Sequence, residues 1–204
     1  LIADEYLEDY HTLQQQVADY LAGDTTKHFD SVELHTIQTY YYGLRTDLDG
    51  NTIYGDYDLV TTMTANAMGT VNWLADLGTT WQDKVTQPVG GMWRRSHNPS
   101  MAKGEEYVEV LGGQIVDLGG EILYETAANT LLTDESGRVN GVVCEQSDGT
   151  TVTLYCNNAV VLASGGYANN LEMVQETNNY WPSIPDDTGT TNPSGQTGDG
   201  IVMA

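Results

Sequence analysis

The sequence predicts an α/β fold in which a helical N-terminal part precedes an antiparallel excursion of strands and a final strand that ends in glycines. Three observations support this class. The first 120 residues carry apolar side chains at helical spacing. Residues 121–156 alternate short runs of β-forming residues with turn sequences. The run 160–167 then begins as an apolar strand and continues through two adjacent glycines, Gly165 and Gly166.

Two helices are expected in the first 42 residues. The first is expected over 6–21, within an acidic and tyrosine-bearing stretch. Ser31, preceded by Asp30, is a suitable N-cap for a second helix that runs to about Tyr42. Residues 43–55 read as a polar loop, and their acidic positions lack the ligand spacing of an EF-hand calcium loop.

A third, longer helix is expected from its N-cap Asp56 to its stop at Gly78. Its inward face is predicted from apolar residues four, four, four and three apart: Leu59, Met63, Ala67, Val71 and Leu74. A fourth helix is expected from about Met101 to Leu118, with Gly119 and Gly120 as its stop. Its apolar side comprises Tyr107, Leu111, Ile115 and Leu118.

Strands are predicted at about 121–125, 128–133, 138–147, 150–156 and 159–163. The turn sequences 134–137 and 148–149 separate them. Pairing outward from a two-residue turn places Cys144 opposite Thr153 and Cys156 opposite Gly141. The two cysteines would then face opposite sides of the sheet, so we expect no disulfide.

The chain of 204 residues carries 29 acidic and 7 basic side chains, a net charge of −22. Such a charge repels phosphates, so neither nucleic acid nor an anionic membrane is expected as a partner. A solubilising surface and adaptation to high salt both remain open. No run of about eighteen apolar residues predicts a membrane span. The N-terminus lacks a signal-peptide pattern and an initiator Met, and we expect an internal piece of a longer chain.

Two segments near the C-terminus suit a large, flat cofactor that bears phosphates. The strand 160–163 ends in small residues, so another molecule can approach its backbone closely. The later loop 190–200 is rich in Gly, Thr and Asn, and supplies backbone N–H donors and the carboxylate of Asp199. The two elements in this order are more specific than either alone.

Together with the segment 94–99, these motifs resemble the fumarate reductase and succinate dehydrogenase flavoprotein family, in particular its soluble fumarate and urocanate reductases. The resemblance covers roughly residues 30–204. Ser164 stands where the family has Thr, and Asn98 replaces a second arginine. The family implies a Rossmann-like FAD-binding domain, which we expect over 91–204, beside a mainly helical segment over 1–90. The glycine-rich dinucleotide turn of that domain is expected upstream.

The resemblance also implies individual contacts to FAD. Asp199, between Gly198 and Gly200, matches the family's FAD carboxylate, whereas the residue alone reads as a turn aspartate. The strand end would pass close to the cofactor, although tight packing explains the same small residues. The predicted cofactor-binding residues are Ala128, at the adenine, and Ala163, Ser164, Gly165, Gly166, Thr191, Asn192, Gly198, Asp199 and Gly200.

Arg94, Arg95 and His97 form the basic cluster of the sequence. Their counterparts in the family lie near the flavin, and we expect them to position the flavin or a nearby loop rather than to catalyse. His28 and His35, like His11, read as surface histidines. Neither the two cysteines nor the scattered histidines have the spacing of a metal site.

The resemblance implies reduction of a carbon–carbon double bond conjugated to a carboxylate or carbonyl, by hydride transfer from flavin N5. The substrate would be a small unsaturated carboxylic acid, and electrons would come from haem, an FMN domain or a reduced carrier, as in anaerobic respiration. No catalytic residue is assigned, because the family's acid and substrate clamp are expected beyond Ala204. The alternatives are a flavin dehydrogenase or oxidase of the ketosteroid dehydrogenase or aspartate oxidase type, and an acidic interaction module without a cofactor.

Overall fold

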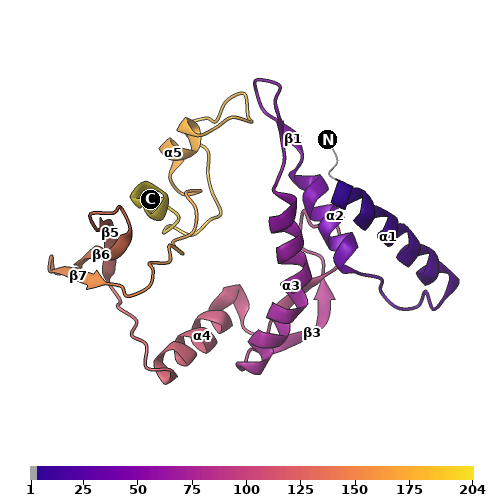
Figure 1. Cartoon of the computed structure of the whole chain (residues 1–204), viewed down its shortest axis with the longest axis horizontal. Helices are drawn as coiled ribbons and strands as arrows, with labels where there is room; N and C mark the ends of the chain where they lie inside the picture. The colour runs from indigo at the N-terminus through magenta and orange to yellow at the C-terminus, as the bar shows by residue number, and fades with distance from the viewer. Residues whose placement is uncertain (1–3) are drawn as a thin grey trace. The chain divides into compact units, whose positions relative to one another are not determined.

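The computed structural model describes residues 4–204. The chain divides into two compact units, Leu1–Ile122 and Leu123–Ala204, and each is described by itself. Figure 1 shows the elements of both units. The mixture of helices and antiparallel strands confirms the predicted α/β class. This division does not test the expected boundary at residues 90 and 91, which stays a prediction.

Three helices make up most of the first unit: α1 (Asp4–Ala22), α2 (Val32–Gly43) and α3 (Tyr57–Asp76). α2 packs against both α1 and α3. Both predicted caps are present. Ser31 Oγ accepts the Leu34 N–H at 3.1 Å, and the Asp56 carboxylate accepts the Leu59 N–H at 3.1 Å. All three helices were expected from the sequence.

The buried face of α3 differs from the prediction in its first half. Leu59 and Met63 are 70 % and 50 % exposed, and Val60 and Thr64 turn inward instead. A helix turns about 100° per residue, so repeated steps of four drift off one face by about 40° each. Alternating steps of three and four hold the face. The inward positions are Tyr57, Val60, Thr64, Ala67, Val71 and Leu74.

The end of α3 confirms the predicted stop. Gly78 has φ +114°, and its N–H donates to the Ala75 carbonyl at 2.9 Å. The next N–H, that of Thr79, donates to the Leu74 carbonyl at 2.9 Å. This is the Schellman pattern, in which the left-handed residue is usually glycine.

The packing of α2 on α3 includes a buried hydrogen bond. Thr36 and Thr64 are 1 % and 3 % exposed, and their Oγ1 atoms lie 2.6 Å apart. Beside them the rings of Tyr6, Tyr40 and Tyr57 contact one another with centroids 5.1–6.0 Å apart. These three tyrosine rings therefore connect α1, α2 and α3.

The expected polar loop after α2 contains a short hairpin, β1 (Arg45–Thr46) with β2 (Thr52–Ile53). The Asp47 carboxylate accepts the N–H groups of Asp49 and Asn51 at 3.0 and 2.7 Å. Those bonds make Asp47 a turn residue.

A second hairpin pairs β3 (Trp81–Thr86) with β4 (Ser96–Pro99), and a single 3₁₀ turn (Ala102–Gly104) leads into α4 (Glu105–Asp117). The buried Glu106 carboxylate accepts the N–H and hydroxyl of Thr80 at 2.5 and 2.6 Å, and the Met101 N–H at 2.8 Å. The Thr80 hydroxyl first, and then the backbone N–H donors, hold the pKa of Glu106 below its ordinary value.

The predicted fourth helix is confirmed as α4, which ends at Gly119 with φ +82°. Its predicted apolar side is only partly buried. Tyr107 and Leu111 are half-buried, but Ile115 and Leu118 are 44 % and 86 % exposed, because the last turn has no neighbour in the unit that covers it.

The second unit contains a three-stranded antiparallel sheet in the order β5 (Thr126–Thr133), β6 (Val139–Gln146) and β7 (Thr151–Tyr155). Gly137 and Gly149 both have φ +84° in the turns between them. The antiparallel excursion and the turn 134–137 are therefore confirmed. Two short helices follow, α5 (Leu171–Glu176) and α6 (Asp199–Met203).

The strand predicted at 121–125 is wrong. Residues 121–123 are irregular, and Tyr124 and Glu125 form a turn. Glu125 has φ +50°, a left-handed conformation that a strand excludes.

The buried strand predicted at 159–163 is also wrong. Val161 and Leu162 are 84 % and 41 % exposed, and the segment is not assigned to any strand. A strand needs a hydrogen-bonded neighbour, and residues 4–204 offer this segment none.

The predicted cysteine register is off by one residue. Cys144 pairs with Val152, and the Cys156 N–H donates to the Asn140 carbonyl at 2.9 Å. The reason is a three-residue loop, 147–149, in place of a two-residue turn. Both cysteines consequently share one face, four positions apart, which is too far for a disulfide. Both are free thiols in the structure.

Candidate functional site

The segment 160–170, which was expected to begin as a strand, lies beside the loop 190–200 in the second unit. Two asparagines join them. Asn169 donates its backbone N–H to the Gln196 carbonyl at 2.9 Å and its Nδ2 to the Ser194 carbonyl at 3.2 Å. Asn170 Nδ2 donates to the Thr197 carbonyl at 3.0 Å. Neither asparagine was singled out from the sequence, where both read as ordinary loop residues.

Two glycines of the loop are fixed by contacts within the unit. Gly198 is buried with φ +89°, and a Cβ there would lie 2.6 Å from Met173 Sδ. A Cβ on the buried Gly200 would lie 2.2 Å from Ser164 Oγ. The loop therefore lies directly against Ser164, and the left-handed backbone at position 198 favours glycine there.

Two other glycines are not explained by packing inside the chain. Gly166 and Gly195 have no positive φ, and a Cβ on either would meet no atom within 4 Å. Ala163 and Ser164 beside them are exposed. An open stretch of backbone without side chains fits the close approach of a large flat cofactor.

Asp199 is exposed between two buried glycines, and its Oδ1 accepts the Thr197 hydroxyl at 2.9 Å. Thr191 and Asn192 are also exposed. The Asn192 N–H and Nδ2 donate to Thr190 Oγ1 at 3.1 and 2.9 Å, so its backbone donor is already used in a local turn. Asp199 thus keeps an accessible carboxylate, whereas the backbone N–H of Asn192 is already bonded within the loop.

Ala128 lies on β5 opposite Cys144, beside an irregularity in register before Thr130. Such bulges re-aim the side chains around them. α6, which begins at Asp199, lies against β5. The predicted adenine contact and the predicted FAD carboxylate therefore belong to adjoining elements of one unit.

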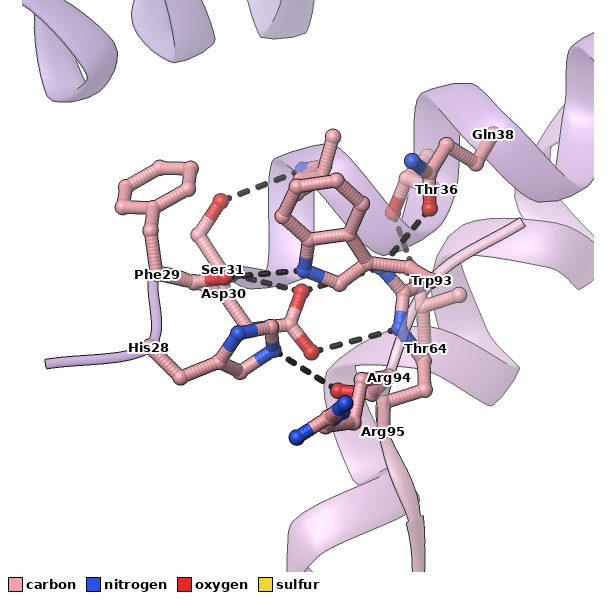
Figure 2. Close-up of polar contacts among 11 residues, drawn as sticks. His28, Phe29, Asp30, Ser31, Thr36, Gln38, Thr64, Trp93, Arg94 and Arg95 are labelled. Carbon is pink, nitrogen blue, oxygen red and sulfur yellow. Dashed lines mark hydrogen bonds and ion pairs between the residues drawn. The ribbon is translucent and has the colours of Figure 1, made fainter. Parts of the chain in front are cut away.

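A second cluster lies in the first unit, where hydrogen bonds join residues 93–95, before β4, to residues 28–30, before α2 (Figure 2). We call this set of contacts the clasp. The Trp93 indole N–H donates to the Phe29 carbonyl at 2.8 Å, and His28 Nε2 lies 2.7 Å from the Arg94 carbonyl. The rings of His28 and Trp93 stack with centroids 5.5 Å apart. Two neighbouring residues of one segment, Trp93 and Arg94, are thus bonded to two neighbouring residues of the other, Phe29 and His28.

Arg95 completes this clasp. Its guanidinium donates to both carboxylate oxygens of Asp30, at 2.9 and 3.2 Å, and to Gln38 Oε1 at 2.8 Å. Arg95 therefore holds residues 30 and 38 in place, and the expected role of the basic cluster beside the flavin stays a prediction. The Arg94 side chain is exposed. His97 is half-buried on β4, with its ring edge-on to Trp81 at 6.1 Å.

His35 departs from its prediction as a surface histidine, because it is half-buried on α2. Burial, and next the nearby charge of Arg95, lower its pKa below the ordinary 6.5, and Asp30 opposes the shift. Among residues 4–204, no three His, Cys, Asp or Glu side chains form a metal-binding group, and no helix is long and apolar enough to cross a bilayer.

The chain belongs to the FAD binding domain family, whose model matches residues 21–204. It is 45 % identical over 203 residues to the NADH:acrylate oxidoreductase of Vibrio harveyi, which covers 98 % of this chain and 20 % of that protein. It is 30 % identical over 152 residues to the urocanate reductase of Eggerthella lenta, which covers 74 % of this chain and 25 % of that protein. The chain thus spans a fifth to a quarter of the length of these relatives.

Among solved structures, the open conformation of a flavocytochrome c3 fumarate reductase matches with a TM-score of 0.68 and 25 % identity, over 86 % of this chain and 29 % of that one. The predicted family and FAD as its cofactor are confirmed. The individual FAD contacts stay predictions. Asp199, the open backbone at Gly166 and the seated loop are chemically suited to them.

Proposed function

We propose that this chain is the FAD-contacting segment of an oxidoreductase that reduces a carbon–carbon double bond conjugated to a carboxylate or carbonyl. The observation that carries the proposal is 45 % identity to an NADH:acrylate oxidoreductase along 98 % of the chain. The contact between loop 190–200 and Ser164 supports it, because that contact leaves the Asp199 carboxylate and the backbone of Gly166 accessible.

When bound, FAD supplies hydride from its reduced ring. The residues of this chain bind and orient it. Asp199 accepts a hydrogen bond from the cofactor, and Gly165 and Gly166 allow it to lie against the backbone. Thr191 and Asn192 border the ring, and Ala128 contributes a backbone contact to the adenine. Ala163, Ser164, Gly198 and Gly200 shape the same surface.

The substrate we propose is a small unsaturated carboxylic acid. Acrylate, urocanate and fumarate are named in the relatives and in the structural neighbour. They share a double bond that the carboxyl or carbonyl group polarises. The name of the first relative makes NADH the first electron donor to test, ahead of a haem or FMN carrier.

The test is an anaerobic assay of the flavin-loaded protein purified from its source. Reduced viologen dye, and separately NADH, would be supplied with acrylate, fumarate or urocanate. We expect the dye to be oxidised in proportion to the acid reduced. Turnover only with saturated substrates and oxygen would instead support a dehydrogenase or oxidase. A protein without flavin absorbance at about 450 nm would support the alternative of an acidic interaction module without a cofactor.

A further inference from the structure

The first unit contains a pocket of about 580 Å³ that gathers three of the chain's four histidines. Residues of α2, of α3 and of the segment 94–97 line it. His28, Arg94 and Arg95 are seen together in Figure 2. The volume lies in the range that small organic ligands occupy.

The titratable groups that line this pocket are mostly basic. They are His28, His35, His97, Arg94, Arg95 and Asp30. Asp30 neutralises Arg95 through the bidentate pair described above. In the described part of the chain, the exposed Arg94 guanidinium forms no hydrogen bond or ion pair, so its positive charge is not compensated.

This concentration of positive charge is unexpected in a chain of net charge −22. Burial first, and then the charge of Arg95, lower the pKa of His35, while Asp30 opposes the shift. Ring contacts with Trp93 and Trp81 account for the places of His28 and His97, but no such contact accounts for the exposed Arg94 guanidinium beside them. A bound anion would stabilise the arrangement.

The remaining wall of the pocket is apolar. Ala67, Met68 and Val71 contribute from α3, and Val85 contributes from β3. Ser31 and Val32, the N-cap and first residue of the twelve-residue α2, also line the pocket, so the positive end of the helix dipole adds to the basic side. The pocket therefore offers one charged side and one apolar side.

We propose that this pocket binds a small organic carboxylate whose apolar body lies against α3 and β3 and whose carboxylate meets Arg94 and the three histidines. Arg94 supplies an unpaired guanidinium, which recognises carboxylates bidentately. Arg95 and Asp30 hold the wall in place. This inference does not rest on the proposed reaction.

The test uses the 204-residue chain and 3-phenylpropionate, which has no double bond beside its carboxylate to reduce. The imidazole C2–H resonances would be followed by proton NMR as the acid is added. We expect the signals of His28, His35 and His97 to move with one common dissociation constant, and that of His11, outside the pocket, to stay in place.

The deciding variant is Arg94→Gln, whose side chain takes no part in the clasp. It should weaken binding by roughly tenfold or more, because a charge-assisted contact is lost. Lys27→Gln removes the same charge one residue before His28, but Lys27 does not line the pocket, so its effect should stay within about twofold.

Four results would overturn the proposal: no movement of the three histidine signals, equal binding of neutral 3-phenylpropanol, unchanged binding by Arg94→Gln, or displacement of the acid by one equivalent of FAD. The second would reduce the pocket to an apolar cavity. The last would assign it to the cofactor.

Discussion

The side-chain amide of Asn170 donates to the carbonyl oxygen of Thr197 at 3.0 Å, while its Oδ1 accepts the Met173 N–H at 3.1 Å. One side chain therefore caps α5 and also holds the loop that precedes Asp199. The loop is tethered to the N-cap of α5, 27 residues away in sequence, so its position beside the segment that we propose lies against FAD depends on this bond.

Replacing Asn170 separates these two roles. Asn170→Ala loses the cap and the tether and should destabilise the protein by about 1–3 kcal/mol. Asn170→Asp keeps the accepting oxygen for the cap but removes the donor to Thr197. We expect thermal unfolding of the Asp variant to lie near that of the parent, with faster loss of flavin on dialysis. Equal flavin retention by Asn170→Asp and the parent would contradict the role of the Asn170–Thr197 hydrogen bond in holding the loop.

Asp199 tests the cofactor site directly. Asp199→Ala in the flavin-loaded protein should weaken FAD retention by roughly 10- to 100-fold, because a charge-assisted hydrogen bond of about 1.5–3 kcal/mol is lost. Flavin absorbance after equilibrium dialysis measures it. Asp187→Ala removes an exposed carboxylate of the same unit and serves as the control. If both variants keep FAD equally well, Asp199 is only the turn residue that its bond to Thr197 describes.

Gly198 and Gly195 give a matched pair within one loop. Gly198→Ala places a Cβ at φ +89° and 2.6 Å from Met173 Sδ, whereas Gly195→Ala meets open space. The left-handed backbone and the overlap should cost Gly198→Ala about 1–3 kcal/mol of unfolding free energy. Gly195→Ala should unfold close to the parent in urea. A similar loss in both would mean that the loop is not seated as the structure shows.

The features that the sequence predicted are the ones that local chemistry determines. Ser31 and Asp56 cap helices by bonding N–H groups three residues ahead, and Gly78 ends one through its own φ. The family motifs were recognisable because glycines such as Gly198 and Gly200, which lie close to Met173 and Ser164, stand at a fixed spacing in the chain.

The failures depend on choices that local sequence leaves open. One extra residue in the loop after Gln146 moved the partner of Cys144 by one position and reversed the predicted faces. The pairing of Arg95 with Asp30 joins residues 65 apart, and no pattern in the sequence links them. The basic pocket around His35 follows from that pairing, so it could be found only in three dimensions.

The hydrogen bond between the buried hydroxyls of Thr36 and Thr64 has a direction that substitutions can reveal. Thr64 Oγ1 lies 3.1 Å from the Val60 carbonyl, which can only accept, so the Thr64 hydroxyl donates there and Thr36 donates to Thr64. Thr36→Val should cost about 1 kcal/mol, because Thr64 keeps its acceptor. Thr64→Val should cost about 2–3 kcal/mol, because the buried Thr36 hydroxyl is left unpaired. Chemical denaturation of both variants decides the order, and the reverse order would refute the direction.

His35 predicts how stability depends on pH. Its pKa is lowered in the folded protein, first by burial and then by Arg95, below the 6.5 of an unfolded chain. The unfolded chain therefore takes up this proton more readily. The stabilising contribution is fully present above about pH 6.5 and is lost as the pH falls through the folded pKa. His35→Gln cannot take up the proton, so its melting temperature should fall less between pH 7.5 and pH 5 than that of the parent. His11→Gln, at an exposed position of the same unit, should keep the parent's slope. A parental slope in His35→Gln as well would show that other groups set the pH dependence.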